Sequence, residues 1–242
     1  IRQFTGNDYS IYNAGIDGKY VNLSCLAIEC ILDRYSPKMI VLDCGSTELC
    51  HERGKPMKLN YMNFSAPYYH KTKTAKRYFD EMSCKESICV KSNLFCYGNG
   101  KILRYANSVM SGGTRINDGY DPLFGTSIDT TKLKKNEPVK EIVVDAYSEN
   151  NLRRVLHLCK DKGVNLVLAS SPRFRPENDN ELIHSLSQEY GVPYIDIYNS
   201  VFFNNHPELF KDTSHLNNDG ATIYTQLFFE ELKPYLETLR QQ

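Results

Sequence analysis

The chain has 242 residues, with 29 Lys and Arg against 29 Asp and Glu, so its formal net charge is zero. This length suits one α/β domain of good size or two small ones. The charge balance argues against an electrostatic nucleic-acid binder, which would concentrate positive charge. No run of about eighteen apolar residues is present that could span a membrane.

Eight cysteines are present, and none forms a Cys-x-x-Cys pair, so a zinc ribbon is not predicted. Three of them (Cys84, Cys89 and Cys96) lie in an irregular region that leaves room for one disulfide. Four lie in predicted core elements, where a thiol acts as a small hydrophobic group: Cys25, Cys30, Cys44 and Cys159. Outside the C-terminal turn described below, no histidine has a second ligand at metal spacing, and no phosphate- or dinucleotide-binding loop is visible. We therefore predict neither a metal nor a cofactor.

The first half of the chain predicts a strand, a helix and a second strand. Residues 10–14 have the pattern of a short strand, and the glycines of Asn13–Gly18 predict a sharp turn with a backbone N–H facing outward. Apolar spacing from Leu23 to Ile31 predicts a helix that ends before Pro37. Residues 39–42 are wholly apolar, as in a strand buried on both faces of a parallel sheet. The polar stretch 43–48 follows, where ligands bind in open α/β sheets.

Residues 50–138 interrupt this alternation. Charged residues, Tyr, Asn and Gly dominate, and only residues 68–82 have the pattern of a helix. Irregular segments of this length inside a domain are usually functional or disordered. We predict one domain over residues 1–242, with 50–138 as an insertion above the sheet that supplies a wall of the substrate site.

Regular elements return after the insertion. A helix capped by Ser148 and ending at Gly163 precedes a buried strand over 164–169, which leads into Ser170-Ser171-Pro172-Arg173. A helix over 181–190, a strand over 194–197 and a C-terminal helix complete the chain. Alternating helices and apolar strands predict a three-layer α/β/α domain with a parallel, flavodoxin-like sheet.

One polar turn directly ahead of the C-terminal helix stands out. Asp212 lies three residues before His215, and Asn217 or Asn218 can cap the helix that follows. Such a turn can hold a carboxylate against one imidazole nitrogen while the other faces a cleft, which prepares a histidine as general base for a hydroxyl. The alternative is a solvated His215, because these residue types are also ordinary in loops and caps.

Three segments converge on the carboxyl edge of the predicted sheet: Gly15–Gly18, Gly45–Glu48 and the Asp212–His215 turn. The motif Asp212-x-x-His215-Leu-Asn-x-x-Gly-Ala is the stronger signal, and Asn13-Ala14-Gly15-Ile16-Asp17-Gly18 ahead of the helix and the 37–43 strand is the second. On these motifs the chain resembles the SGNH/GDSL hydrolase superfamily, nearest to the SGNH-like branch of Bacteroidetes-type genomes. It is more distantly similar to polysaccharide O-acetyl-transfer proteins.

The resemblance implies a role for each matched residue. His215 would be the base, Asp212 its orienting acid, and the backbone N–H of Gly18 an oxyanion donor. The family usually supplies an Asn donor from its third block, where this chain has Gly45-Ser46-Thr47-Glu48, so a hydroxyl of Ser46 or Thr47 would take that place. The family's nucleophile is a serine in a Gly-x-Ser turn after the first strand. No such turn precedes Ser10, so we expect the serine upstream of Ile1, with Ser46 as the alternative inside the chain.

The resemblance therefore implies a serine esterase, deacetylase or O-acyl transferase that acts on an acylated carbohydrate or small ester in an extracytoplasmic compartment. The alternatives are a catalytically inactive carbohydrate-binding or scaffold protein on the same fold, and a flavodoxin-like ligand binder. Ser171-Pro172-Arg173 has two interpretations as well. Arg173 could bind a substrate carboxylate with two parallel hydrogen bonds, or it could be a solvated arginine in a plain loop.

Overall fold

The computed structural model describes residues 9–15, 21–53, 68–81, 122–129, 141–176 and 180–241. The chain divides into two compact units. The first, which we call the sheet unit, comprises Ile1–Asn13, Pro37–Met57 and Asp121–Gln242. The second, the helical unit, comprises Ala14–Ser36 and Lys58–Tyr120. That residues 1–242 form a single domain stays a prediction.

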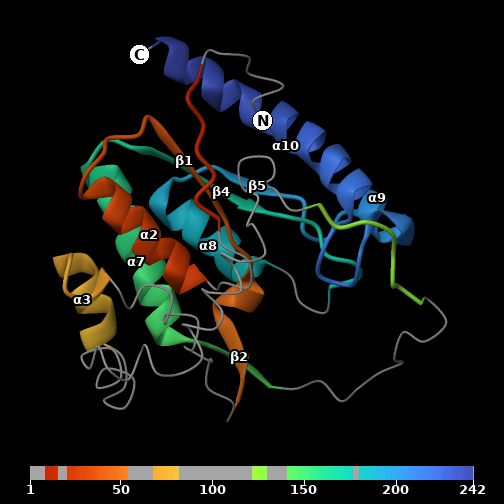
Figure 1. Cartoon of the computed structure of the whole chain (residues 1–242), viewed down its shortest axis with the longest axis horizontal. Helices are drawn as coiled ribbons and strands as arrows, with labels where there is room; N and C mark the ends of the chain where they lie inside the picture. The colour runs from red at the N-terminus through yellow and green to blue at the C-terminus, as the bar shows by residue number, and fades with distance from the viewer. Residues whose placement is uncertain are drawn as a thin grey trace, which may run out of the picture. The chain divides into compact units, whose positions relative to one another are not determined.

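The sheet unit is built on a parallel three-stranded sheet in the order β1-β4-β5 (Figure 1). The strands are β1 (Met39–Asp43), β4 (Asn165–Ser170) and β5 (Tyr194–Asp196). The central strand is the most deeply buried, as its unbroken apolar run predicts. The prediction that residues 39–42 are buried on both faces is wrong, because β1 is an edge of the described sheet and Val41 is 38% exposed.

Helices cover both faces of this sheet. Val167, Ala169 and Ile195 pack against Phe228 and Leu232 of α10 (Asn218–Gln241). Side chains alternate along a strand, so the buried side chains between them in β4 face the opposite way. On that side lie α7 (Ala146–Asp161) and α8 (Glu181–Tyr190), as Figure 1 shows. The predicted three-layer α/β/α fold is thereby confirmed.

The ends of α7 and α8 follow from local chemistry. The N-cap of α7 is Asp145 rather than the predicted Ser148, and its carboxylate accepts hydrogen bonds from Ser148 N at 2.8 Å and Ser148 Oγ at 2.6 Å. Gly163 and Gly191 follow the two helices with φ values of 66° and 63°, a left-handed conformation that suits glycine. The predicted helix ends are therefore confirmed, and only the α7 cap was misassigned.

The first residues of the predicted insertion pair with a strand that follows it. After η1 (Ser46–Glu48), β2 (Cys50–Glu52) pairs antiparallel with β3 (Ile142–Val144). Asp145 N also donates to Leu49 O at 2.7 Å. The two-stranded ribbon of β2 and β3 therefore brings the two ends of the intervening segment together. Most of the segment itself, including Cys84, Cys89 and Cys96, lies outside the described residues.

The strand predicted over residues 10–14 is not formed. Residues 9–15 have no regular secondary structure, and Tyr9 Oη donates to Leu236 O at the end of α10, at 3.1 Å. Tyr9 is thereby joined to α10, and Tyr12 is 85% exposed. Two short helices, α9 (Val201–Asn204) and η5 (Pro207–Leu209), lead from β5 toward α10.

The thiols that lie in described elements are mostly buried, as predicted. Cys25, Cys44 and Cys159 are buried and Cys30 is half-buried. Burial raises the pKa of Cys159 to about 11, so this thiol stays protonated at neutral pH. None of the described helices is long and apolar enough to cross a membrane.

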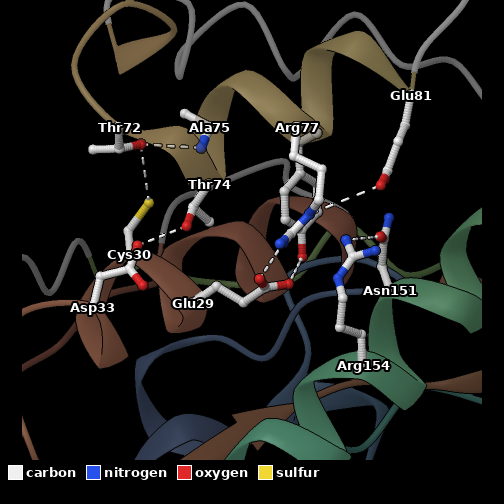
Figure 2. A network of polar contacts seen from close by, with 11 residues as sticks. Glu29, Cys30, Asp33, Thr72, Thr74, Ala75, Arg77, Glu81, Asn151 and Arg154 are labelled. Atoms are coloured by element: carbon white, nitrogen blue, oxygen red, sulfur yellow. Dashed lines mark hydrogen bonds and ion pairs between the residues drawn. The ribbon is translucent and has the colours of Figure 1, made fainter.

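The helical unit contains α2 (Val21–Leu32), as predicted, and α3 (Lys73–Asp80), which is shorter than the predicted 68–82. Figure 2 shows the polar contacts between them. Glu29 is only 3% exposed, accepts a hydrogen bond from Tyr78 Oη at 2.7 Å and pairs with Arg77. Thr72 caps α3 by accepting a hydrogen bond from Ala75 N at 3.0 Å. The contacts of Glu29 with Tyr78 and Arg77 join α2 to α3, whereas the Thr72 contact fixes the start of α3.

Glu29→Ala should lower the free energy of unfolding by about 2 kcal/mol, because the buried Tyr78 hydroxyl loses this acceptor. Glu29→Gln should cost less, since its amide oxygen can still accept from Tyr78, and the Arg77 side chain is 40% exposed and can be hydrated. Urea unfolding of both variants measures the difference. Equal costs would show that the charge, rather than the hydrogen bond to Tyr78, provides the stabilisation.

Candidate functional site

The two ends of the Asp212–His215 turn are held together by backbone hydrogen bonds, and buried aromatic residues pack beneath them. Phe210 and Leu216 form an isolated antiparallel bridge, and Lys211 N donates to His215 O at 2.8 Å. Phe210 is fully buried and its ring lies 5.5 Å from that of Phe174. Aromatic packing at the base thus fixes the ends of the turn, while its polar residues lie at the surface.

Within the turn, Asp212 and His215 are in direct contact. His215 Nδ1 lies 2.9 Å from Asp212 Oδ1 and 3.0 Å from Asp212 Oδ2. Asp212 Oδ1 also accepts hydrogen bonds from the backbone N–H groups of Ser214, at 2.8 Å, and of His215, at 3.0 Å. The Nε2 atom of His215 has no hydrogen-bond partner among the described residues, and the His215 side chain is 58% exposed. One ring nitrogen is therefore bound to the acid and the other is accessible.

These contacts favour an ionised Asp212. Partial burial alone would raise the pKa of this carboxyl, but the hydrogen bonds from His215 and from the backbone of Ser214 outweigh it and lower the pKa. The lowered pKa adds stability that is present above the pKa of the unfolded chain and is lost as pH falls through the folded value. At neutral pH the carboxylate can therefore orient the ring and stabilise an imidazolium.

Asn217, one of the two predicted caps, caps the N-terminus of α10 directly after the Asp212–His215 turn. Its Oδ1 accepts a hydrogen bond from Gly220 N at 3.0 Å. Its Nδ2 donates to Glu208 O at 2.6 Å and to Gly125 O at 3.3 Å. The Asn217 side chain is buried, and its hydrogen bonds connect the start of α10 to the segments that carry Glu208 and Gly125. These hydrogen bonds fix the start of α10. They also restrain the C-terminal end of the Asp212–His215 turn, because only Leu216 separates His215 from Asn217.

The loop after β4 lies next to this turn. Phe174 N donates to Thr213 O at 3.1 Å, and Arg173 Nη1 lies 3.5 Å from Ser214 Oγ. The loop after the carboxyl end of β4 and the Asp212–His215 turn therefore lie side by side. The predicted convergence of Gly15–Gly18 and Gly45–Glu48 with this turn stays a prediction.

A carboxylate that the sequence analysis did not single out lies at the same edge. Asp43, the last residue of β1, accepts from Ser171 Oγ at 2.6 Å and from Ser171 N at 3.2 Å. Part of Asp43 reaches solvent, but the dense protein around its carboxyl raises the pKa, with the Ser171 hydrogen bonds and the Arg173 charge opposing that shift. A raised pKa means that folding becomes less favourable as pH rises past the pKa of the unfolded chain, until Asp43 is ionised in both states.

The other predicted site residues that the structure describes are Ser46 and Thr47, and neither is hydrogen-bonded to His215. Gly18 lies outside the described residues. Ser46 is 7% exposed, its backbone N–H donates to Asn180 Oδ1 at 2.9 Å, and its Oγ has no hydrogen-bond partner in the described part of the chain. Thr47 is half-buried beside Gly45. Neither hydroxyl forms a hydrogen bond with the imidazole of His215 in the structure as described.

A second histidine–acid pair was also missed. His184 of α8 has its Nε2 atom 2.9 Å from Asp196 Oδ2. Asp196 ends β5 and also accepts from Tyr198 N at 3.0 Å and from Asn180 Nδ2 at 3.3 Å. The Asp196 side chain is 25% exposed and that of His184 53%. The described part of the chain thus contains these two histidine–acid contacts of similar length, of which only Asp212–His215 lies in the turn ahead of α10.

The described residues contain no group of three or more His, Cys, Asp or Glu that could hold a metal ion. The site therefore consists of the Asp212–His215 pair, the neighbouring Arg173, and the Asp43–Ser171 pair at the adjacent strand ends. Comparison with known proteins gives no match: no family model, no curated protein and no solved structure is significantly similar to this chain.

Proposed function

We propose that this protein is a serine esterase or O-acyl transferase whose general base is His215. The observation that carries the proposal is the contact of both Asp212 carboxylate oxygens with His215 Nδ1, which leaves Nε2 accessible. An imidazole held in this way can remove a proton from a hydroxyl at neutral pH. The substrate class that we propose is an acylated carbohydrate or a similar small ester, in keeping with the SGNH resemblance.

The proposed reaction has two steps. A serine hydroxyl attacks the acyl carbonyl, His215 Nε2 accepts its proton, and the Asp212 carboxylate stabilises the imidazolium. His215 then returns the proton to the leaving alcohol, and an acyl-enzyme remains. Water or a sugar hydroxyl attacks this intermediate in the second step, again with His215 as base. Of the two hydroxyls proposed as oxyanion donors, that of Thr47 is the more accessible, since Ser46 is buried.

A fluorophosphonate probe tests the proposal, because it labels only a serine whose hydroxyl is activated by a base. We expect stoichiometric labelling of the full-length protein and loss of labelling in His215→Ala. Mass spectrometry of the labelled peptide then identifies the nucleophile. Far-ultraviolet circular dichroism of the variant is the control for folding.

The competing function is a binding protein without catalytic activity on the same fold. The burial of Ser46 favours it, because this is the in-chain candidate for the nucleophile. Absence of labelling in the folded wild-type protein would support this function and contradict ours. Labelling that persists unchanged in His215→Ala would also contradict the role that we assign to the histidine.

A further inference from the structure

Arg173 is a half-buried arginine beside the Asp212–His215 turn whose guanidinium has few partners. Its Nη1 contacts Ser214 Oγ at 3.5 Å, which is long for a hydrogen bond. It forms no ion pair with a carboxylate of the described residues. A guanidinium carries five N–H donors. Most of these donors have no partner among the described residues and can serve a ligand.

The loop that carries Arg173 is held by other segments at three consecutive residues. The backbone N–H groups of Arg173, Phe174 and Arg175 each donate to a different segment, and the acceptors are Tyr198 O at 3.0 Å, Thr213 O at 3.1 Å and Asn204 Oδ1 at 2.7 Å. Arg175 has a φ of 47°, and within the described ranges it is the one non-glycine residue with a positive φ. Such backbone strain tends to occur at functional sites. The fold thus maintains a strained loop that positions Arg173 next to the turn.

The nearby charges leave Arg173 open to an anion. Asp43 is hydrogen-bonded to Ser171 through both oxygens, and Asp212 is bound to His215. Neither carboxylate pairs with the guanidinium; burial raises the pKa of Asp43, and the charge of Arg173 offsets only part of that rise. A planar guanidinium with unused donors matches the geometry of a carboxylate or a phosphate.

We propose that Arg173 binds an anionic group of the substrate, a carboxylate or a phosphate, close to the ester on which His215 acts. The substrate would then be an ester on an acidic carrier rather than on a neutral one. The statement about the ester rests on the proposed function, whereas binding of the anion by Arg173 does not. The two parts are therefore tested by separate measurements.

Anion binding is tested by nuclear magnetic resonance of the full chain labelled with ¹⁵N-arginine. Sodium phosphate and sodium acetate are titrated separately at constant ionic strength, and Arg173→Lys assigns the Arg173 Nε–Hε signal. We expect a saturable shift at Arg173 and none at Arg175, which is exposed two residues along the same loop. A response to phosphate alone or to acetate as well identifies the anion. No saturable shift, or equal shifts at both arginines, would overturn the proposal.

Substrate preference is tested with two activated esters, 4-nitrophenyl acetate and the 4-nitrophenyl monoester of succinic acid. Arg173→Gln should lower the ratio of kcat/KM for the anionic ester to that for the neutral one by about tenfold to a hundredfold, the worth of a charge-assisted hydrogen bond. Arg175→Gln should leave the ratio unchanged. An unchanged ratio in Arg173→Gln would refute the preference. Anion binding without any ester hydrolysis would instead refute the proposed function and leave the anion site standing.

Discussion

His215→Ala should reduce kcat/KM for ester hydrolysis by about 10⁴-fold or more, because the serine hydroxyl then has no base. Asp212→Asn should cost about 10³- to 10⁴-fold, since an amide can place the wrong imidazole nitrogen toward the nucleophile. Both carboxylate oxygens of Asp212 contact Nδ1 of His215, so we expect the two substitutions to lower the same activity. Steady-state hydrolysis of a 4-nitrophenyl ester measures them.

The matched control is His184→Ala. His184 and Asp196 also form a histidine–acid contact, at 2.9 Å, and the two histidine side chains are similarly exposed, at 53% for His184 and 58% for His215. Loss of His184 should leave hydrolysis unchanged if the location of the pair, rather than its mere presence, confers activity. Equal losses for both histidine variants, or none for His215→Ala, would contradict the assignment of the base.

Gly220→Ala should lower the free energy of unfolding by about 3 kcal/mol, at the upper end of what overpacking costs. A Cβ at this position would lie 2.1 Å from Leu209 O, closer than any stable contact. The carbonyl cannot move away without cost, because it accepts the hydrogen bond from Asn217 N at 3.0 Å. Thermal or urea unfolding measures the change.

The sign of this effect makes the test informative. Gly220 lies in the first turn of α10. At an unhindered helical position the same substitution would stabilise the protein by up to about 1 kcal/mol. A neutral or stabilising result would therefore show that the contact between the helix start and Leu209 is looser than in the structure. Because Asn217 lies between this contact and the Asp212–His215 turn, we also expect slower fluorophosphonate labelling of Gly220→Ala if His215 is the base.

Much of the fold could be predicted because its signals are local. The apolar run of residues 164–169 and the helical spacing of residues 181–190 each identify an element by the period of their own side chains. The errors arose where tertiary context decides. Residues 10–14 have a strand-like pattern but no regular secondary structure, and β1 has the composition of a buried strand but lies at an edge of the described sheet.

The candidate site divides in the same way. Asp212 and His215 are three positions apart, so a single turn suffices to bring them together, and their contact could be expected from sequence. The Asp43–Ser171 contact joins residues 128 positions apart, and the Arg173–Ser214 contact joins residues 41 positions apart. Such pairs depend on which strands are neighbours and on their register. The neighbouring positions of β1 and β4 and the pairing of Asp43 with Ala169 bring Asp43 and Ser171 together, whereas Arg173 reaches Ser214 because the loop after β4 is hydrogen-bonded to the Asp212–His215 turn.

The central claim is that Asp212 holds His215 with Nδ1 protonated and Nε2 available as a base. Two-dimensional ¹H–¹⁵N spectroscopy of the histidine rings measures this directly at a pH where the ring is neutral, without any substrate. We expect the His215 signals of the Nδ1–H tautomer, and a shift away from that pattern in Asp212→Ala. A His215 ring in the Nε2–H tautomer, or one whose signals do not respond to Asp212→Ala, would contradict the account.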